Sequence, residues 1–144
     1  MFVKMIATAA TSVMLLAGAA SAETFIVEML DRGKDGLMVF EPAFIAAQPG
    51  DTIKFVSTTK GHNVVSIAGM LPEGVEPFRT KLNEDFTLTL RAEGLYGIKC
   101  APHYVMGMVG LIQVGEAVNL QESAAIGHPK KSARRFERMF EQVR

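Results

Sequence analysis

Short apolar runs separated by glycine and proline fill the chain between residues 24 and 114. Residues 85–90 alternate apolar and polar side chains, the pattern of a strand with one buried face. Gln48-Pro49-Gly50-Asp51 has the proline and glycine of a type II turn. Many short strands with such turns are typical of an all-β sandwich. The expected strands cover residues 24–30, 37–40, 44–47, 52–56, 63–67, 85–90, 95–100 and 108–114.

The C-terminal segment has a different periodicity. Apolar side chains recur at intervals of three and four over residues 131–143, which predicts an amphipathic helix, and residues 120–126 favour a shorter one. The polar face of the longer helix is mostly basic and could bind a membrane surface. Because Glu137 and Glu141 interrupt that face, we expect the helix to pack its apolar side on the sandwich instead.

The N-terminus has the three parts of a secretory signal peptide. Lys4 supplies a positive charge, residues 5–19 are uncharged and mostly apolar, and Ala20-Ser21-Ala22 matches a small-residue cleavage site. The apolar run is too short for a good membrane anchor. We therefore expect residues 1–22 to be cleaved and residues 23–144 to form a single domain with its own core.

Charge and cysteine content restrict the function. Cleavage would remove Lys4 alone among charged residues, leaving 14 of the 15 basic residues against 15 acidic ones, a formal charge of −1. This balance gives no reason to expect a nucleic-acid partner. The single cysteine, Cys100, cannot form an intramolecular disulfide, and an exposed free thiol is a liability in an oxidising compartment. Metal ligation would remove that liability.

Cys100 begins a segment rich in metal-binding side chains. His103 follows three residues later, Met106 and Met108 come next, and His62 lies far upstream. Thiolate and thioether are soft ligands that suit Cu(I), while imidazole suits both oxidation states of copper. One thiolate, two imidazoles and one thioether form the ligand set of a blue electron-transfer site. The residues predict a site for one copper ion, with either methionine as the fourth ligand.

Other interpretations of Cys100 and His103 stay open at this point. A lone cysteine is often a small buried hydrophobe. A Cys-x-x-His pair can be half of a zinc site, although structural zinc sites usually have two or more cysteines. The pair can also be a nucleophile with its base in a thiol hydrolase. Cys100 ends a strand-like run, however, whereas reactive cysteines favour electropositive helix starts.

The segments around these residues resemble one family of copper proteins. Residues 96–108, Gly61-His62-Asn63 and the two expected C-terminal helices are similar to the pseudoazurins, small type 1 copper proteins of the cupredoxin family. The resemblance covers residues 23–144. It implies a cupredoxin-like Greek-key β-sandwich with two C-terminal α-helices.

The resemblance also implies roles for individual residues. Through the family's His-x-x-x-x-Met spacing it selects Met108 over Met106 as the fourth ligand. The implied copper ligands are His62, Cys100, His103 and Met108. Near them, the resemblance implies that the Asn63 backbone amide donates to the Cys100 sulfur, that Pro102 limits donors in the loop, and that Met38 lies near the His103 ring. The basic residues implied to surround the copper end and to dock partners are Arg32, Lys60, Arg79 and Lys99.

The function implied by the resemblance is one-electron transfer, with no enzymatic activity of its own. A soluble periplasmic monomer would cycle Cu(II)/Cu(I), take electrons from a cytochrome-type donor and pass them to a copper nitrite reductase in denitrification. No stable membrane association is expected. The alternative is a copper-binding or storage module that holds the metal without redox turnover.

Overall fold

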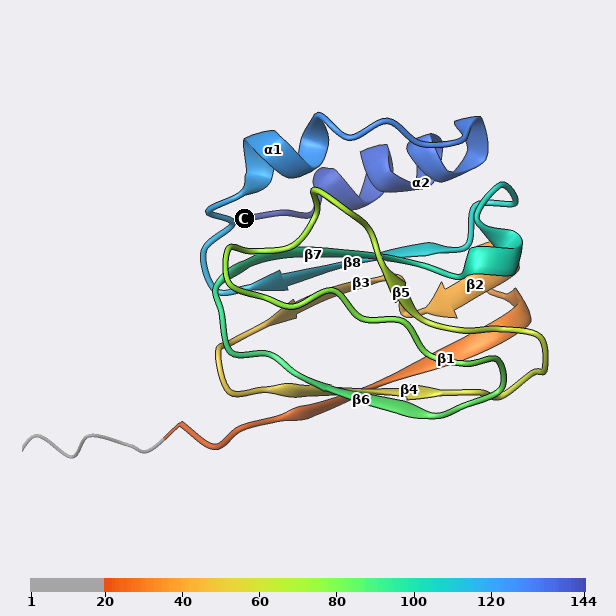
Figure 1. Cartoon of the computed structure of the whole chain (residues 1–144), viewed down its shortest axis with the longest axis horizontal. Coiled ribbons are helices and arrows are strands. Elements are labelled where there is room, and N and C mark those ends of the chain that lie inside the picture. The colour runs from red at the N-terminus through yellow and green to blue at the C-terminus, as the bar shows by residue number, and fades with distance from the viewer. Residues whose placement is uncertain (1–19) are drawn as a thin grey trace, which may run out of the picture.

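The computed structural model describes residues 20–144, which form two packed four-stranded sheets with helices on one side (Figure 1). One sheet has the order β2-β1-β4-β6 and the other β3-β8-β7-β5. The strands are β1 (Thr24–Gly33), β2 (Gly36–Glu41), β3 (Phe44–Ala47), β4 (Thr52–Val56), β5 (Val65–Ser66), β6 (Phe86–Thr89), β7 (Gly94–Lys99) and β8 (Val109–Val114). The helices are η1 (Ala101–His103), α1 (Leu120–Ala124) and α2 (Lys130–Phe140). The predicted β-sandwich with two C-terminal helices is therefore confirmed, while residues 1–19 of the predicted signal peptide lie outside the described residues.

The two sheets differ in their hydrophobic patterns because only one of them has both faces covered. In β4, Ile53 and Phe55 are buried and Lys54 between them is exposed, as expected for a strand with one face in solvent. All six residues of β8 are buried. The inner face of β8 packs in the core between the sheets, and α2 covers its outer face. Continuous apolar runs in β7 and β8 follow from this double coverage.

The C-terminal helix packs against the sandwich as predicted. Phe136 and Met139 are 1% and 4% exposed and form a second hydrophobic cluster with Val109 and Leu111 of β8. The helix ends at Phe140, three residues before the predicted limit, and the chain continues in a turn. Among residues 20–144, no helix has the length and apolar character needed to cross a membrane.

The strand expected at residues 63–67 is much shorter than predicted. Only Val65–Ser66 pairs with β7. Before it, the Val64 amide donates to the Thr80 hydroxyl (3.0 Å) and the Asn63 side chain donates to the Thr80 carbonyl (3.3 Å). The Val64 carbonyl also accepts from the Thr80 amide, and the Ser66 amide donates to the Phe78 carbonyl, both at 3.0 Å, so this segment bonds residues 78–80 through backbone as well as side chains. The result is an irregular segment immediately after His62.

Candidate metal centre

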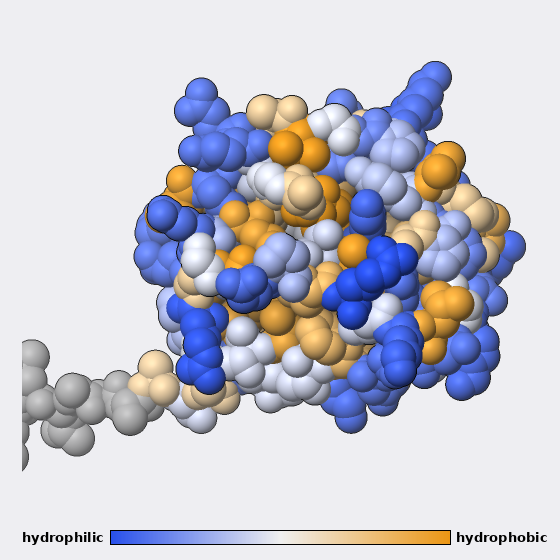
Figure 2. Space-filling view, in the orientation of Figure 1, coloured by the Kyte–Doolittle hydropathy of each residue, from blue (hydrophilic) through white to orange (hydrophobic). Residues whose placement is uncertain are grey.

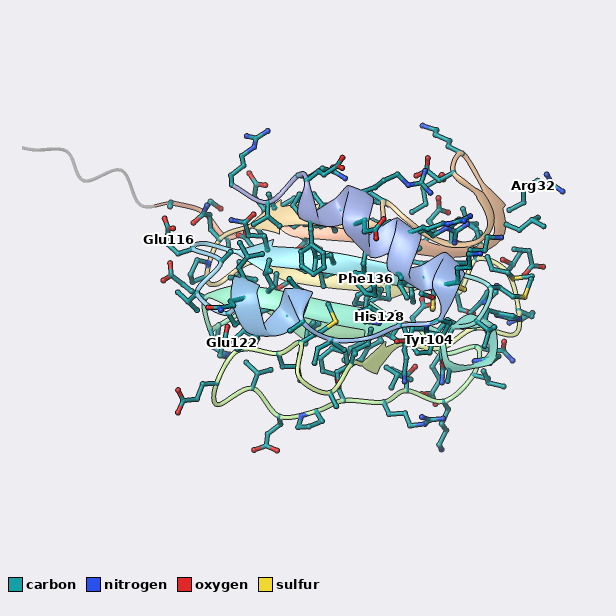
Figure 3. The ribbon with its side chains drawn as sticks, turned by 90° about the horizontal axis from the view of Figure 1, so that it is seen from above. Arg32, Tyr104, Glu116, Glu122, His128 and Phe136 are labelled. Atoms are coloured by element: carbon teal, nitrogen blue, oxygen red, sulfur yellow. The ribbon has the colours of Figure 1, made fainter. Side chains whose placement is uncertain are left out.

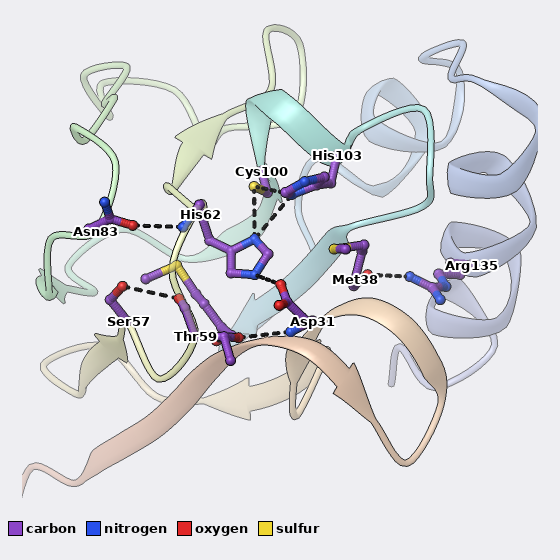
Figure 4. Close-up of polar contacts among 11 residues, drawn as sticks. Asp31, Met38, Ser57, Thr59, His62, Asn83, Cys100, His103 and Arg135 are labelled. Carbon is purple, nitrogen blue, oxygen red and sulfur yellow. Dashed lines mark hydrogen bonds and ion pairs between the residues drawn. The ribbon is translucent and has the colours of Figure 1, made fainter.

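Two loops, β4–β5 and β7–β8, bring the predicted ligands to one end of the sandwich. His62 lies between β4 and β5, Cys100 follows β7, His103 ends η1 and Met108 directly precedes β8. Figure 1 shows these loops at the right-hand end, and Figure 4 shows Cys100, His62 and His103 facing one another. His62 and Cys100 are 38 positions apart in the chain. They meet because β4 and β7 both end at this end of the sandwich.

The three nearest donor atoms form a compact triangle. The two histidine Nδ1 atoms are 3.1 Å apart, and the Cys100 Sγ lies 3.7 Å from the His62 Nδ1 and 3.6 Å from the His103 Nδ1. A point in their plane and equidistant from all three lies about 2.0 Å from each, from the 3.1, 3.6 and 3.7 Å sides. Metal–imidazole bonds of about 2.0–2.1 Å, as found for zinc, match this separation. The residues therefore fit a single transition-metal ion.

Local chain geometry explains why Cys100 and His103 point the same way. Pro102 is the second residue of the 3₁₀ turn, in which the His103 amide donates to the Cys100 carbonyl at 3.2 Å. In such a turn, side chains three residues apart lie on one side. Gly107, with φ of +92°, then reverses the chain in a conformation that other residues rarely adopt. This turn leads directly into Met108.

Met108 is better placed as a fourth donor than Met106. Its side chain is fully buried in the core cluster that also contains Cys100, whereas Met106 is 38% exposed. The Met108 backbone also bonds to both loop ligands. Its carbonyl accepts from the Cys100 amide at 2.9 Å, and its amide donates to the His103 carbonyl at 3.1 Å. These bonds hold the Met108 backbone beside both loop ligands, and its role as the fourth ligand stays a prediction.

The two histidines differ in environment. His62 is fully buried, and its Nε2 lies 2.8 Å from the Asp31 carboxylate. An N–H at Nε2 leaves the Nδ1 lone pair free to bind a metal. His103 is half-buried. Loss of solvent lowers the pKa of His103, the neighbouring His62 lowers it further, and Asp31 acts in the opposite direction.

Cys100 is a protected thiol in this fold. Its side chain is completely buried, and burial raises the pKa of the thiol, with the backbone amides of Asn63 and His103 acting against the rise. The Asn63 carboxamide accepts from the Ala101 amide at 2.9 Å and so ties the two ligand loops together. A buried thiol with a raised pKa is a poor nucleophile, which argues against a thiol hydrolase.

The remaining predicted residues differ in their exposure. Met38 is half-buried with φ of +52°, and Pro102 is exposed. The side chains of Arg32, Lys60 and Arg79 are exposed. Lys99 is half-buried, with its Nζ 4.6 Å from the centre of the Tyr104 ring. Its charge is therefore partly engaged within the protein.

His128 lies apart from the donor triangle, in contact with Tyr104 and Phe136. Its Nδ1 is 2.6 Å from the Tyr104 hydroxyl, and its ring stacks on Phe136 at 4.4 Å (Figure 3). Burial lowers the pKa of His128, and the Lys99 charge lowers it further. The imidazole therefore connects the ligand loop to α2 as a neutral ring.

Two charged residues at the centre were not predicted. Asp31 contacts His62, and the Arg135 guanidinium of α2 donates to the carbonyls of Leu37 (2.9 Å), Met38 (2.7 Å) and Gly107 (2.6 Å). These contacts join residues separated by 28 to 98 positions, and nothing in the local sequence marks either residue.

Comparison with known proteins identifies the family. Residues 27–115 match the model of copper-binding proteins of the plastocyanin/azurin family. The chain belongs to the plastocyanin/azurin family. It is 51% identical to a pseudoazurin of Paracoccus pantotrophus over 99% of both chains.

Solved structures of pseudoazurins have the same fold as this plastocyanin/azurin family member. That of Methylobacterium extorquens AM1 is 43% identical and covers 84% of this chain and 99% of its own, with a TM-score of 0.82. That of Hyphomicrobium denitrificans is 40% identical and covers 84% and 98%, with a TM-score of 0.80. Family membership and the donor set together make copper, rather than zinc, the metal, and the protein a copper electron-transfer protein of the cupredoxin fold.

Proposed function

We propose that His62, Cys100, His103 and Met108 hold one copper ion and that the protein carries single electrons between periplasmic redox proteins. The observation that carries this proposal is the triangle of two Nδ1 atoms and one Sγ with sides of 3.1 to 3.7 Å, next to the buried Met108. When bound, copper supplies the Cu(II)/Cu(I) couple. The chain contributes a rigid donor set that suits both states.

The His103 side of the site is the proposed route for the electron. His103 is half-buried, and the exposed side chains of Val105 (75%) and Met106 (38%) follow it in the same loop. Figure 2 shows hydrophobic groups among charged ones along the right-hand edge, the end at which this loop lies in Figure 1. An apolar patch with a charged rim is a typical docking surface for a transient partner.

The proposed acceptor is a copper nitrite reductase in denitrification, with a cytochrome-type donor. Because formal charges cancel over the chain, steering must come from local groups. Arg32, Lys60 and Arg79 are exposed and available for this role. Such steering would favour an acidic partner surface and weaken with salt, since the Debye length is about 8 Å at physiological ionic strength.

Export to the periplasm is proposed from the N-terminal pattern alone. Residues 1–22 would be removed, and the mature chain would begin at Glu23, directly before β1. Mass spectrometry of the protein recovered from a periplasmic fraction tests this proposal. A mature mass that includes residues 1–22 would contradict it.

The copper proposal is tested by the absorption spectrum and reduction potential of the protein after addition of Cu(II). We expect one copper per chain, an intense blue thiolate-to-Cu(II) band and a reversible one-electron couple. Tight copper binding without a reversible couple would instead indicate a storage module. Thiol reactivity that persists after Cu(II) addition would exclude Cys100 as a ligand.

The docking proposal is tested by charge reversal. Lys60→Glu and Arg79→Glu should lower the second-order rate of electron transfer to a nitrite reductase and flatten its salt dependence, at unchanged potential. Lys54→Glu, on the exposed side of β4, is the matched control. Equal rates and salt slopes for all variants would show that these residues do not steer the partner.

A further inference from the structure

His62, the buried histidine of the proposed site, contacts the Asp31 carboxylate on the side of its ring that faces away from the other ligands. The His62 ring is 0% exposed, and its Nε2 lies 2.8 Å from the Asp31 Oδ1, whereas its Nδ1 faces Cys100 and His103 (Figure 4). The imidazole thus lies directly between the carboxylate and the proposed copper position. Because the ring is buried, Asp31 is its partner on that side.

Asp31 is itself held by the adjacent loop. Its backbone amide donates to the Thr59 hydroxyl at 2.8 Å, and that hydroxyl donates to the Met29 carbonyl at 3.1 Å. The Thr59 amide donates to the same carbonyl at 3.1 Å. These bonds join the end of β1 to the segment that precedes His62. The backbone that carries the carboxylate is therefore fixed relative to the ligand.

We propose that Asp31 is a positioning residue that sets both the orientation of His62 and the reduction potential of the copper site. Its carboxylate accepts the Nε2–H bond, which selects the tautomer with a free Nδ1, and its charge makes the imidazole a stronger donor. Cu(II) carries one more positive charge than Cu(I), so a nearby carboxylate stabilises the oxidised form more. This inference rests on the proposed role of His62 as a ligand.

The effect of the Asp31 charge on the reduction potential involves no proton transfer. Reduction adds one electron from the donor protein to the site, oxidation gives one electron to the acceptor, and the Nε2–H proton stays between His62 and Asp31 throughout. Asp31 is 55% exposed, so water screens its charge and limits the effect. The 2.8 Å contact to a fully buried ring lets the remaining, unscreened part of this charge act on the copper site.

The decisive variant is Asp31→Asn, which keeps an oxygen acceptor at the same position and removes the charge. At a fixed applied potential, we expect the Cu(II):Cu(I) ratio to fall by about three- to tenfold, a tenfold change being about 59 mV for a one-electron couple. Asp35→Asn, in the exposed turn between β1 and β2, removes the same charge without contacting a ligand and should leave the ratio unchanged. Asp31→Leu removes both the charge and the acceptor.

A second measurement separates positioning from charge. Long-range ¹H–¹⁵N NMR of the metal-free protein should show His62 protonated at Nε2 in the native chain and in Asp31→Asn, with this preference lost in Asp31→Leu. If Asp31→Asn retains the blue band but has the same potential as the native protein, the role of Asp31 in setting the potential is wrong. Absence of the blue band from the native protein would instead overturn the proposed function itself.

Discussion

The two histidines of the proposed copper site come from regions that the fold holds in different ways. His62 is fully buried, follows β4 and has a partner on each side of its ring. His103 is half-buried in a 3₁₀ turn, and an exposed apolar segment follows it. The first region fixes the donor geometry, and the second brings one donor close to the surface. An electron carrier needs both, because a rigid site limits rearrangement and a surface ligand shortens the path to a partner.

The largest expected effect is on the donor that both regions share. Cys100→Ser replaces the thiolate whose charge transfer to Cu(II) gives the colour, so the blue band should disappear completely. Absorption spectroscopy of the Cu(II) form measures this. A blue band in the serine variant would mean that the metal lies elsewhere.

The two histidines should respond differently to truncation. His103→Gly opens the site on the half-buried side, so added imidazole should enter and restore a coloured site. His62→Gly leaves a cavity inside the core and an unpaired Asp31, which should destabilise the fold by about 2–5 kcal/mol and resist rescue by imidazole. Denaturant unfolding and imidazole titration measure both effects. Equal rescue of the two variants would contradict the proposed difference between the regions.

The next effect concerns how α2 supports the loop of His103. Arg135→Gln removes a guanidinium that donates to the backbone carbonyls of Leu37, Met38 and Gly107. The bonds to Met38 and Gly107 are part-buried and the bond to Leu37 is exposed, so leaving the first two acceptors unpaired should cost at most about 1–3 kcal/mol each and the third little. Arg138→Gln, on the exposed side of the same helix, is the control. Similar unfolding midpoints for the two variants would show that the hydrogen bonds of Arg135 contribute little to the stability of the fold.

The methionines test which loop position completes the site. Met108→Gln should keep a coloured copper site with a lower potential, because the axial ligand tunes the metal more than it anchors it. Met106→Gln, at an exposed position, should change the potential little. Voltammetry measures both potentials. A larger shift in the Met106 variant would reverse the assignment of the fourth ligand.

The smallest expected effect is on the pH dependence of the protein's stability. It comes from His128, which lies between the β7–β8 loop and α2. Burial lowers the pKa of His128 in the folded protein below its ordinary value of about 6.5. The unfolded chain therefore takes up the proton first as pH falls, so this residue should reduce stability progressively below about pH 6.5 and not above it. His128→Gln should flatten the slope in metal-free protein. An unchanged slope would show that other groups dominate.

The parts of the fold that the sequence predicts are those with a regular pattern. Strands with alternating or continuous apolar runs, such as β4, β6 and β8, lie within two residues of their expected positions. The strand expected at 63–67 is shorter than predicted, because residues 78–80 compete for its backbone: Val64 bonds Thr80 and Ser66 bonds Phe78. That competition depends on residues from another segment and leaves no local signature.

The candidate site shows the same division. The donor set could be proposed from the chemistry of thiolate, imidazole and thioether, although only the family resemblance separated Met108 from Met106. The roles of Asp31 and Arg135 could not be proposed, since each acts on segments distant in the chain. In a chain with 15 basic and 15 acidic residues, a single aspartate or arginine does not stand out. Tertiary contacts alone give these residues their roles.

The most direct test of the proposed site is a pair of crystal structures of the Cu(II) and Cu(I) forms. We expect copper bound by the His62 Nδ1, His103 Nδ1 and Cys100 Sγ, with Met108 as the next donor and Asp31 still bonded to His62 in both forms. The three close donors should lie about 2.0–2.3 Å from the metal, as they do in other transition-metal sites. Copper bound through Met106, or a His62 ring that turns away from Asp31 between the two forms, would contradict this expectation.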